Sequence, residues 1–200
     1  MERDTKRIIA AITGVALLGA GAVAVAQDPK WTTIVDGKSM GDFTRVGAAN
    51  WRVEGGSIVA DKLDGKDPAY LVTKNKYKDF QIYAEFWADE DVNSGIFIRC
   101  KDPAKIDAAL CYEVNIFDKR PDPSYGTGAI VDVAKVIPMP KAAGKWNTYE
   151  ITAQGNHFVV VLNGQKTVDV TNDRLPAAGN VALQYGSGNL KFRKVQIRSL

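Results

Sequence analysis

The chain has 200 residues, and 26 lysines and arginines against 23 aspartates and glutamates give a net charge of +3. The basic residues are scattered and form no stripe, which argues against nucleic acid as a partner. After the first two dozen or so residues there is no long linker, low-complexity tract or repeat, so we expect one domain with a real core.

The N-terminal segment has the composition of a secretory signal peptide. Charged residues precede an apolar run from Ile8, which ends in the small-x-small site Ala24-Val25-Ala26. We expect cleavage after Ala26, a domain over residues 27–200, no stable membrane insertion of the mature chain, and a periplasmic or secreted location. An uncleaved anchor is the competing interpretation, because the run is nearly long enough to span a bilayer.

The rest of the chain consists of short alternating runs separated by Gly, Asp, Asn and Pro turns. The expected strands are residues 51–55, 57–60, 69–73, 80–88, 95–99, 112–117, 128–133, 147–153, 157–164, 165–170, 180–185 and 190–199. Asn163-Gly164 predicts a hairpin with a type I′ turn. Because no stretch has convincing helical periodicity, we predict an all-β sandwich of the jelly-roll kind.

The only two cysteines, Cys100 and Cys111, bracket a short polar loop. In an oxidising compartment they are expected to form a disulfide, which would stabilise the fold by about 3 kcal/mol in the chain-entropy model. They are too few for a zinc site, and the single histidine, His157, lies far along the chain and is expected to be a surface or structural residue.

Alternation within four of the strands separates an apolar set of side chains from a polar and aromatic set, because successive side chains point to opposite faces. If the four strands share a sheet, its outer face collects Tyr83, Glu85, Trp87, Phe97, Arg99, Glu113, Asn115 and Gln184. Aromatic rings pack on the C–H faces of sugars, and planar polar groups bind paired hydroxyls, so this face predicts carbohydrate binding. The alternative is an ordinary surface on which Arg99 forms salt bridges with Glu85 or Glu113.

Ten segments follow one another in the order WTTIVDGKSM, NWRVEGGSIVA, YKDFQIYAEF, NSGIFIRC, CYEVNIFD, TGAIV, KWNTYEI, VVLNGQKTVDV, ALQYG and LKFRKVQI. This ordered set resembles the 3-keto-disaccharide hydrolase domain family, also described as the 3-keto-glucoside 1,2-lyase and 3-keto-2-hydroxy-glucal hydratase domain. The resemblance covers about residues 30–200. It implies a concanavalin A-like lectin/glucanase fold, with the ligand on the concave face of a curved jelly roll.

The resemblance also implies a substrate, which is a glucoside or disaccharide already oxidised to a ketone at carbon 3. The ketone acidifies the C2 hydrogen, so such a site needs a base, a stabiliser for the enolate oxygen and an acid for the leaving group. We expect Glu113 to be the base and Arg99 the stabiliser. Glu85 or Asp118 would serve as the acid or as a substrate ligand. The residues expected to bind the substrate are Asn115, Gln184, Arg120, Tyr83, Trp87 and Phe97.

Two local features qualify this expectation. Many members of the family carry a histidine in the segment that matches ALQYGSG, where this chain has Tyr185 and no histidine. If that histidine is catalytic in the relatives, the mechanism here differs or activity is absent. The segment 118–131 is rich in Pro, Gly and Asp, and is either a wall over the site, with Asp118, Arg120 and Tyr125 available, or a plain connection.

Cofactor use and two other functions stay open at this point. A divalent metal such as calcium is an alternative for Asp118, Asp122 and Asp132, but their spacing matches no metal loop, and no cofactor is identified. The chain is also compatible with a non-catalytic carbohydrate-binding module. A conventional glycosidase would use Glu85 and Glu113 as a carboxylate pair on unoxidised sugars.

Overall fold

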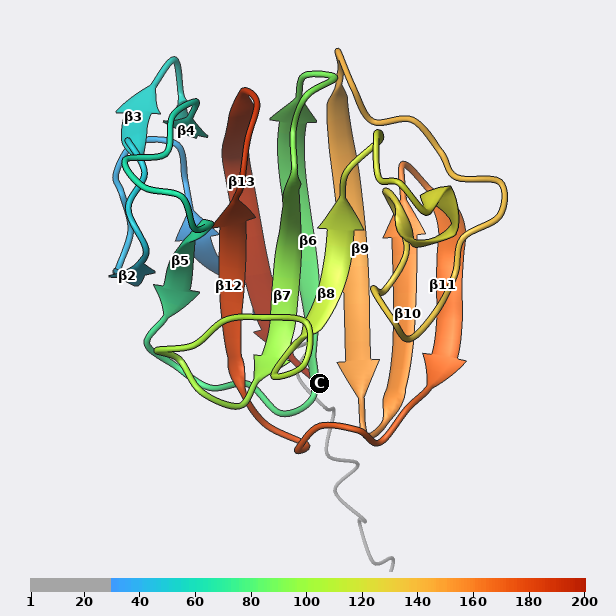
Figure 1. Cartoon of the computed structure of the whole chain (residues 1–200). Coiled ribbons are helices and arrows are strands. Elements are labelled where there is room, and N and C mark those ends of the chain that lie inside the picture. Colours follow the sequence, from blue (N-terminus) through green and yellow to red (C-terminus); the bar gives the residue numbers. More distant parts are fainter. Residues whose placement is uncertain (1–29) are drawn as a thin grey trace, which may run out of the picture.

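Two antiparallel sheets packed face to face form the fold in the computed structural model, which describes residues 30–200 (Figure 1). Sheet A has the order β11 (Gln165–Thr171), β10 (His157–Leu162), β9 (Trp146–Gln154), β6 (Phe80–Ala88), β13 (Leu190–Ser199), β4 (Ser57–Ala60), β3 (Arg52–Glu54), with β1 (Thr32–Val35) paired to β13. Sheet B has the order β2 (Phe43–Val46), β5 (Ala69–Thr73), β12 (Asn180–Tyr185), β7 (Ser94–Cys100), β8 (Tyr112–Ile116). The predicted jelly-roll sandwich is confirmed, and the predicted signal peptide lies outside the described residues.

The core lies between the sheets and follows the alternation of the sequence. In β6, buried and partly exposed residues alternate along all nine positions, and Phe80, Ile82, Ala84 and Phe86 face the core. The inward residues of sheet B come from the same pattern; they are Leu71, Ile96, Ile98, Tyr112, Val114, Ile116, Val181, Leu183 and Tyr185. Each strand therefore has one face fixed by burial of its apolar set.

One predicted hairpin turn is present, whereas one predicted strand is absent. Asn163 and Gly164 both have positive φ, of 51° and 79°, as a type I′ hairpin turn between β10 and β11 requires. The expected strand over residues 128–133 is absent. Gly128 and Asp132 have φ of 93° and 57°, which interrupts an extended backbone, and Ile130 keeps only isolated bridges.

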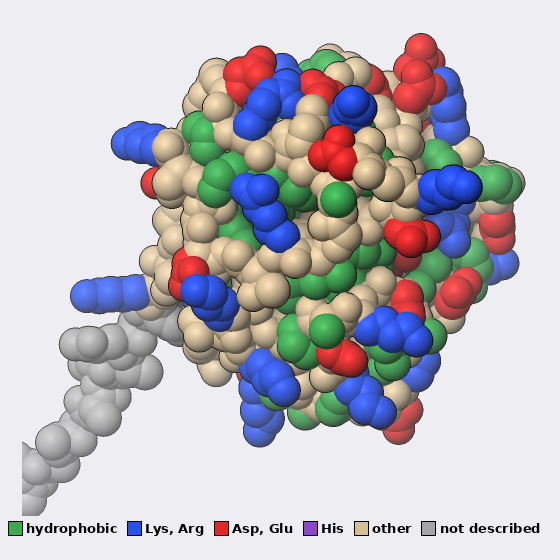
Figure 2. Space-filling model, turned by 60° about the vertical axis from the view of Figure 1, so that its left-hand side comes forward, with side chains coloured by type: hydrophobic (Ala, Val, Ile, Leu, Met, Phe, Trp, Pro, Cys, Tyr) green, Lys and Arg blue, Asp and Glu red, His purple; other side chains and the backbone are tan. Residues whose placement is uncertain are grey.

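Charged side chains are distributed over the surface without a single-sign patch on the face seen in Figure 2, where lysines and arginines alternate with acidic residues. This agrees with the scatter of basic residues along the sequence. Within residues 30–200, no helix has the length and apolar character needed to cross a membrane.

Candidate functional site

The eight residues expected on one face lie on two different sheets. Strand β6, which carries Tyr83, Glu85 and Trp87, belongs to sheet A, whereas the strands that carry the other five residues belong to sheet B. The outer faces of the two sheets point to opposite sides of the sandwich, so the predicted single face is wrong. Alternation identifies which side chains share a face of a strand, but it does not identify the sheet to which the strand belongs.

On sheet A, the predicted β6 residues are engaged by side chains of the neighbouring strand β13. Glu85 pairs with Arg193 and accepts a hydrogen bond of 2.9 Å from the Tyr83 hydroxyl. Burial raises the pKa of Glu85, but these two partners outweigh it and leave the pKa below its ordinary value. Lysine ammonium groups lie 5.2 Å and 5.3 Å from the ring centres of Trp87 and Tyr83. A glycosidase pair of Glu85 and Glu113 is therefore contradicted, because the two carboxylates face away from each other on separate sheets.

Arg99 also departs from its predicted orientation, because a β-bulge reverses it. The pairing of β7 with β12 shifts by one residue at this point, and Arg99 has a φ of 55°. Its guanidinium lies inside the sandwich, 5.8 Å from the ring centres of both Phe80 and Phe158. Its Nη2 donates to the Gly155 carbonyl at 3.1 Å and lies 3.4 Å from Asp79. Arg99 therefore makes no salt bridge with Glu85 or Glu113 and does not reach the outer face.

The outer face of sheet B carries two rows of side chains defined by strand register. One row is Tyr70, Gln184, Gly95 and Asn115, and the next is Val72, Ala182, Phe97 and Glu113. Most of these side chains are buried although they face outward. Four of the sequence-predicted site residues, Phe97, Glu113, Asn115 and Gln184, are thus brought together on one face.

Gly95 forms the floor between the polar side chains of the first row. A Cβ at this position would lie 3.3 Å from Glu113 Cγ and 3.4 Å from Phe97 Cε2, so both side chains lean toward the glycine. Asn115 Oδ1 and Gln184 Oε1 are buried and accept no hydrogen bond within the described residues. A buried amide oxygen without a donor costs free energy, so these two oxygens mark a place where a ligand could supply hydroxyl groups.

The Glu113 carboxyl is buried, and its pKa is raised. It is 7% exposed. Burial raises the pKa of its carboxyl from 4.5 to about 7; the charge of Arg120 lowers it slightly and that of Asp132 raises it. A carboxyl with a pKa near neutrality can both accept and return a proton at physiological pH.

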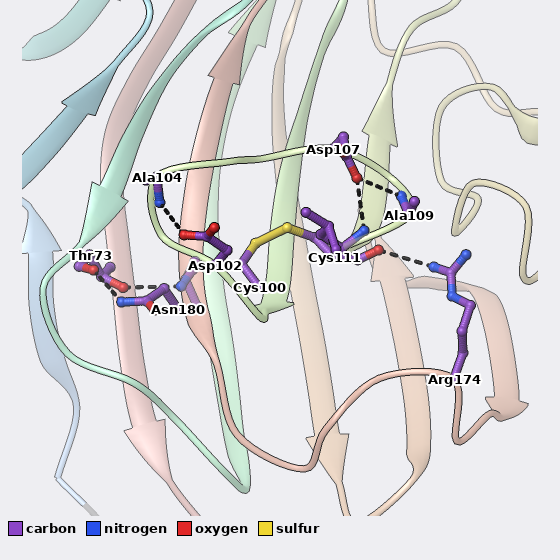
Figure 3. The surroundings of a disulfide bond; sticks show 11 residues. Thr73, Cys100, Asp102, Ala104, Asp107, Ala109, Cys111, Arg174 and Asn180 are labelled. Carbon is purple, nitrogen blue, oxygen red and sulfur yellow. Dashed lines mark hydrogen bonds between the residues drawn. A yellow bond between two sulfur atoms is a disulfide. The ribbon is translucent and has the colours of Figure 1, made fainter.

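The predicted disulfide between Cys100 and Cys111 is present and closes one end of this face (Figure 3). Both cysteines pack with Tyr70, Phe97 and Ile106 in an apolar cluster on the outer face. Figure 3 shows the loop held from inside by turns at Asp102 and Asp107, and from outside by Arg174, which donates to the Cys111 carbonyl. The loop therefore presents Ile106 as a fixed apolar wall.

The segment after β8 flanks the other side of the face, so it is more than a plain connection. Residues 128–131 form backbone hydrogen bonds with Glu113 and Asn115, and the Tyr125 carbonyl accepts from Asn115 Nδ2 at 2.8 Å. Asp118 accepts hydrogen bonds from the Thr127 hydroxyl and from two backbone amides of residues 142 and 143. These bonds engage both carboxylate oxygens, so Asp118 ties this segment to residues 142 and 143.

Tyr70 also belongs to this face, although the sequence predictions place no site residue on strand 69–73. Its outward orientation was readable from the inward position of Leu71 next to it. Tyr185 faces the core and donates to the Gly188 carbonyl, so it does not line the outer face. His157 is exposed on β10 and lies 2.7 Å from Asp169.

A hollow away from this face has few free polar groups. The hollow, of about 420 Å³, lies between β1 and the β2–β5 edge, lined in part by Phe43, Thr73 and Tyr77. Its polar groups are largely engaged, since Asp36 caps a turn and Asp42 pairs with Lys74. Within residues 30–200, no three His, Cys, Asp or Glu side chains form a group that could hold a metal ion.

Several solved structures share this fold. A candidate glycosyl hydrolase from Parabacteroides distasonis superposes with a TM-score of 0.66 at 23% identity, covering 86% of this chain and 100% of that chain. A second candidate glycosyl hydrolase from this organism gives 0.65 at 18% identity, covering 85% and 88%. The carbohydrate-binding module CBM66 from Bacillus subtilis gives 0.55 at 14% identity, covering 84% and 95%. No curated protein matches the sequence.

These similarities, all below 25% identity, concern the fold alone, whereas a family model matches nearly all of the described sequence. The model of the 3-keto-alpha-glucoside-1,2-lyase-like domain aligns with residues 30–198. The ordered motifs of the sequence resemble this family, and three of them contribute strands β7, β8 and β12 to the outer face of sheet B. The chain belongs to the 3-keto-alpha-glucoside-1,2-lyase-like domain family.

Proposed function

We propose that the outer face of sheet B cleaves glycosides that carry a ketone at carbon 3. The observation that carries the proposal is the combination of Glu113, whose pKa is about 7, with two buried amide oxygens around Gly95 that lack a donor. Sugar hydroxyls are donors that would satisfy both oxygens. Membership of the family adds the oxidised substrate class.

In the proposed reaction, ionised Glu113 takes the C2 proton, and the C2–H electron pair moves to give an enolate at C2, C3 and its oxygen. The carbonyl then re-forms, a C1–C2 double bond forms, and the C1–O bond breaks. The leaving oxygen takes the proton that Glu113 holds, so the carboxylate is restored and no other reactant is consumed. Addition of water to the double bond would convert elimination into net hydrolysis.

The substrate would be held by groups that surround Glu113. Phe97 and Ile106 supply apolar surface for the C–H face of the sugar, while Asn115 and Gln184 accept from hydroxyls. Arg120 is half-buried beside the site, and its charge acts on Glu113. We assign Arg120 to substrate binding. We assign no role in the reaction to Arg99, whose guanidinium lies in the core, or to Tyr83 and Trp87, which lie on sheet A.

A non-catalytic carbohydrate-binding module is the second candidate, and the burial of Arg99 favours it. Because the Arg99 guanidinium lies in the core, it cannot stabilise an enolate on the outer face as expected. A binding module would need Phe97 and the amide oxygens but not the elevated pKa of Glu113.

The two candidates predict different outcomes with one substrate. Purified protein incubated with a 3-keto-glucoside in D₂O should exchange the C2 hydrogen and release the aglycone, both followed by NMR, with and without a chelator. Binding of the sugar without exchange or release would support the module instead. An unoxidised glucoside serves as the matched control and should not be cleaved.

We further propose that the protein acts outside the cytoplasm. The Cys100–Cys111 bridge supports this location, because disulfides persist in oxidising compartments. Mass spectrometry of secreted or periplasmic protein should find Gln27 at the N-terminus. Recovery only from the cytosol with Met1 retained would contradict the proposal.

A further inference from the structure

We propose that Tyr70 and Gln184 form a donor–acceptor pair that binds the ketone oxygen and a neighbouring hydroxyl of the sugar. In this pair, the Tyr70 hydroxyl donates to the oxygen that becomes the enolate. The inference deepens the proposed function and rests on it. It assigns to Tyr70 the stabilising role that was expected of Arg99, because the Arg99 guanidinium lies in the core.

The position of Tyr70 follows from the register of sheet B. Tyr70 on β5 lies opposite Gln184 on β12, and Ala182 is two residues away on the same face. Strands β5 and β7 are two strand spacings apart, or about 9.6 Å. The ring centres of Tyr70 and Phe97 are only 5.5 Å apart. The two rings therefore lean toward each other over Ala182, whose small side chain leaves room for them.

The Tyr70 hydroxyl and the Gln184 side chain keep hydrogen-bonding groups that no neighbour uses. Burial raises the pKa of the Tyr70 hydroxyl, and a hydrogen bond with the Gln184 side chain opposes this. Gln184 Oε1 is buried without a donor, so the Tyr70 hydroxyl does not donate to it, and both groups are available to a ligand.

An available donor beside an available acceptor matches the chemistry of an α-hydroxy ketone. The ketone oxygen only accepts hydrogen bonds and fits the Tyr70 hydroxyl. The adjacent hydroxyl can donate and fits Gln184 Oε1. Asn115 Oδ1 and ionised Glu113 only accept, and Asn115 Nδ2 already donates to the Tyr125 carbonyl, so the donors on this face that suit a carbonyl are the Tyr70 hydroxyl and the neighbouring Gln184 amide.

Tyr70 also faces Glu113 across the site. Their strands are separated by three spacings, about 14 Å. Both side chains lean inward, and the Glu113 charge contributes to the raised pKa of Tyr70. A sugar between them would present C2–H to Glu113 and the ketone oxygen to Tyr70. As the proton moves to Glu113, negative charge moves to the oxygen beside Tyr70, where a fixed donor is most effective.

Tyr70→Phe tests this inference, because it removes the hydroxyl and keeps the ring against Phe97. We expect C2 hydrogen exchange and elimination of a 3-keto-glucoside to fall together, by about 100-fold, with little change in KM. Tyr77→Phe is the matched control, since Tyr77 is a half-buried tyrosine in the connection between β5 and β6, outside the site, and its rates should stay at wild-type values. Melting temperatures would be compared for all variants.

A second variant and the wild-type protein distinguish failure of this inference from failure of the proposed function. Gln184→Leu should raise KM because the hydroxyl loses its acceptor. Exchange by Tyr70→Phe within twofold of wild type, or a rise in KM with kcat unchanged, would overturn the assignment of Tyr70 while the proposed function stands. Absence of exchange in the wild-type protein would overturn the proposed function itself, and this inference with it.

Discussion

Replacing Glu113 with glutamine should stabilise the protein above neutral pH while it abolishes turnover. Burial raises the pKa of the Glu113 carboxyl from 4.5 to about 7. Between these two values the folded state holds a proton that the unfolded chain has released, so stability falls as pH rises. The displacement of the pKa corresponds to about 3 kcal/mol, which is lost in full above pH 7. Glutamine keeps the shape of the protonated side chain and cannot ionise.

Urea unfolding of wild type and Glu113→Gln measures this difference directly. The two proteins should be equally stable at pH 4, and the variant should become more stable by up to about 3 kcal/mol at pH 8. Wild-type kcat/KM should rise about tenfold per pH unit below 7 and level off above it, because the base must be ionised. Glu150→Gln, at an exposed position on β9 of the other sheet, is the matched control.

Two results would refute the reasoning. A stability difference between wild type and Glu113→Gln that does not change with pH would show that burial does not raise the pKa of this carboxyl. Near-normal turnover of a 3-keto-glucoside by Glu113→Gln would remove Glu113 from the role of base, even if the stability difference follows the expected curve.

Three further variants separate the site from its surroundings. Glu85→Gln should leave turnover unchanged, because Glu85 faces away from the site on sheet A; a loss of about 100-fold would contradict this placement. Arg99→Met should also leave turnover within about twofold, since its guanidinium is in the core, and a large loss in steady-state rate would return Arg99 to the mechanism. Replacing both Cys100 and Cys111 with serine should cost about 3 kcal/mol in urea unfolding. The double variant should also raise KM at low temperature, because the loop that carries Ile106 loosens; an unchanged KM would limit the bridge to stability.

Much of the fold was predictable because burial imposes a strict pattern on each strand. Except for Arg99, the inward residues of β6, β7, β8 and β12 are the ones that alternation indicated, and the Asn163-Gly164 turn has the expected backbone. The assignment of strands to sheets was not predictable in this way. It depends on contacts between distant segments, such as β6 with β13, which leave no local signal.

Only part of the candidate site could be predicted, because the sequence does not show which strands share a sheet. Phe97, Glu113, Asn115 and Gln184 share a face because β7, β8 and β12 are neighbours in sheet B. Tyr83, Glu85 and Trp87 have the residue types of a sugar site, but cations from β13 lie against all three. Residue type alone therefore does not separate a ligand-binding face from a surface whose aromatic rings are paired with lysine and arginine.

The bulge in β7 links the disulfide to the burial of Arg99. Cys111 faces outward, because Tyr112 beside it faces the core. Under strict alternation from Phe97, Arg99 would face outward and Cys100 inward, on the opposite side of the sheet from Cys111. The extra residue at the bulge reverses both positions, so Cys100 faces outward beside its partner and Arg99 enters the core. The disulfide and an outward Arg99 were thus incompatible expectations, and the disulfide, once predicted, already argued for the bulge.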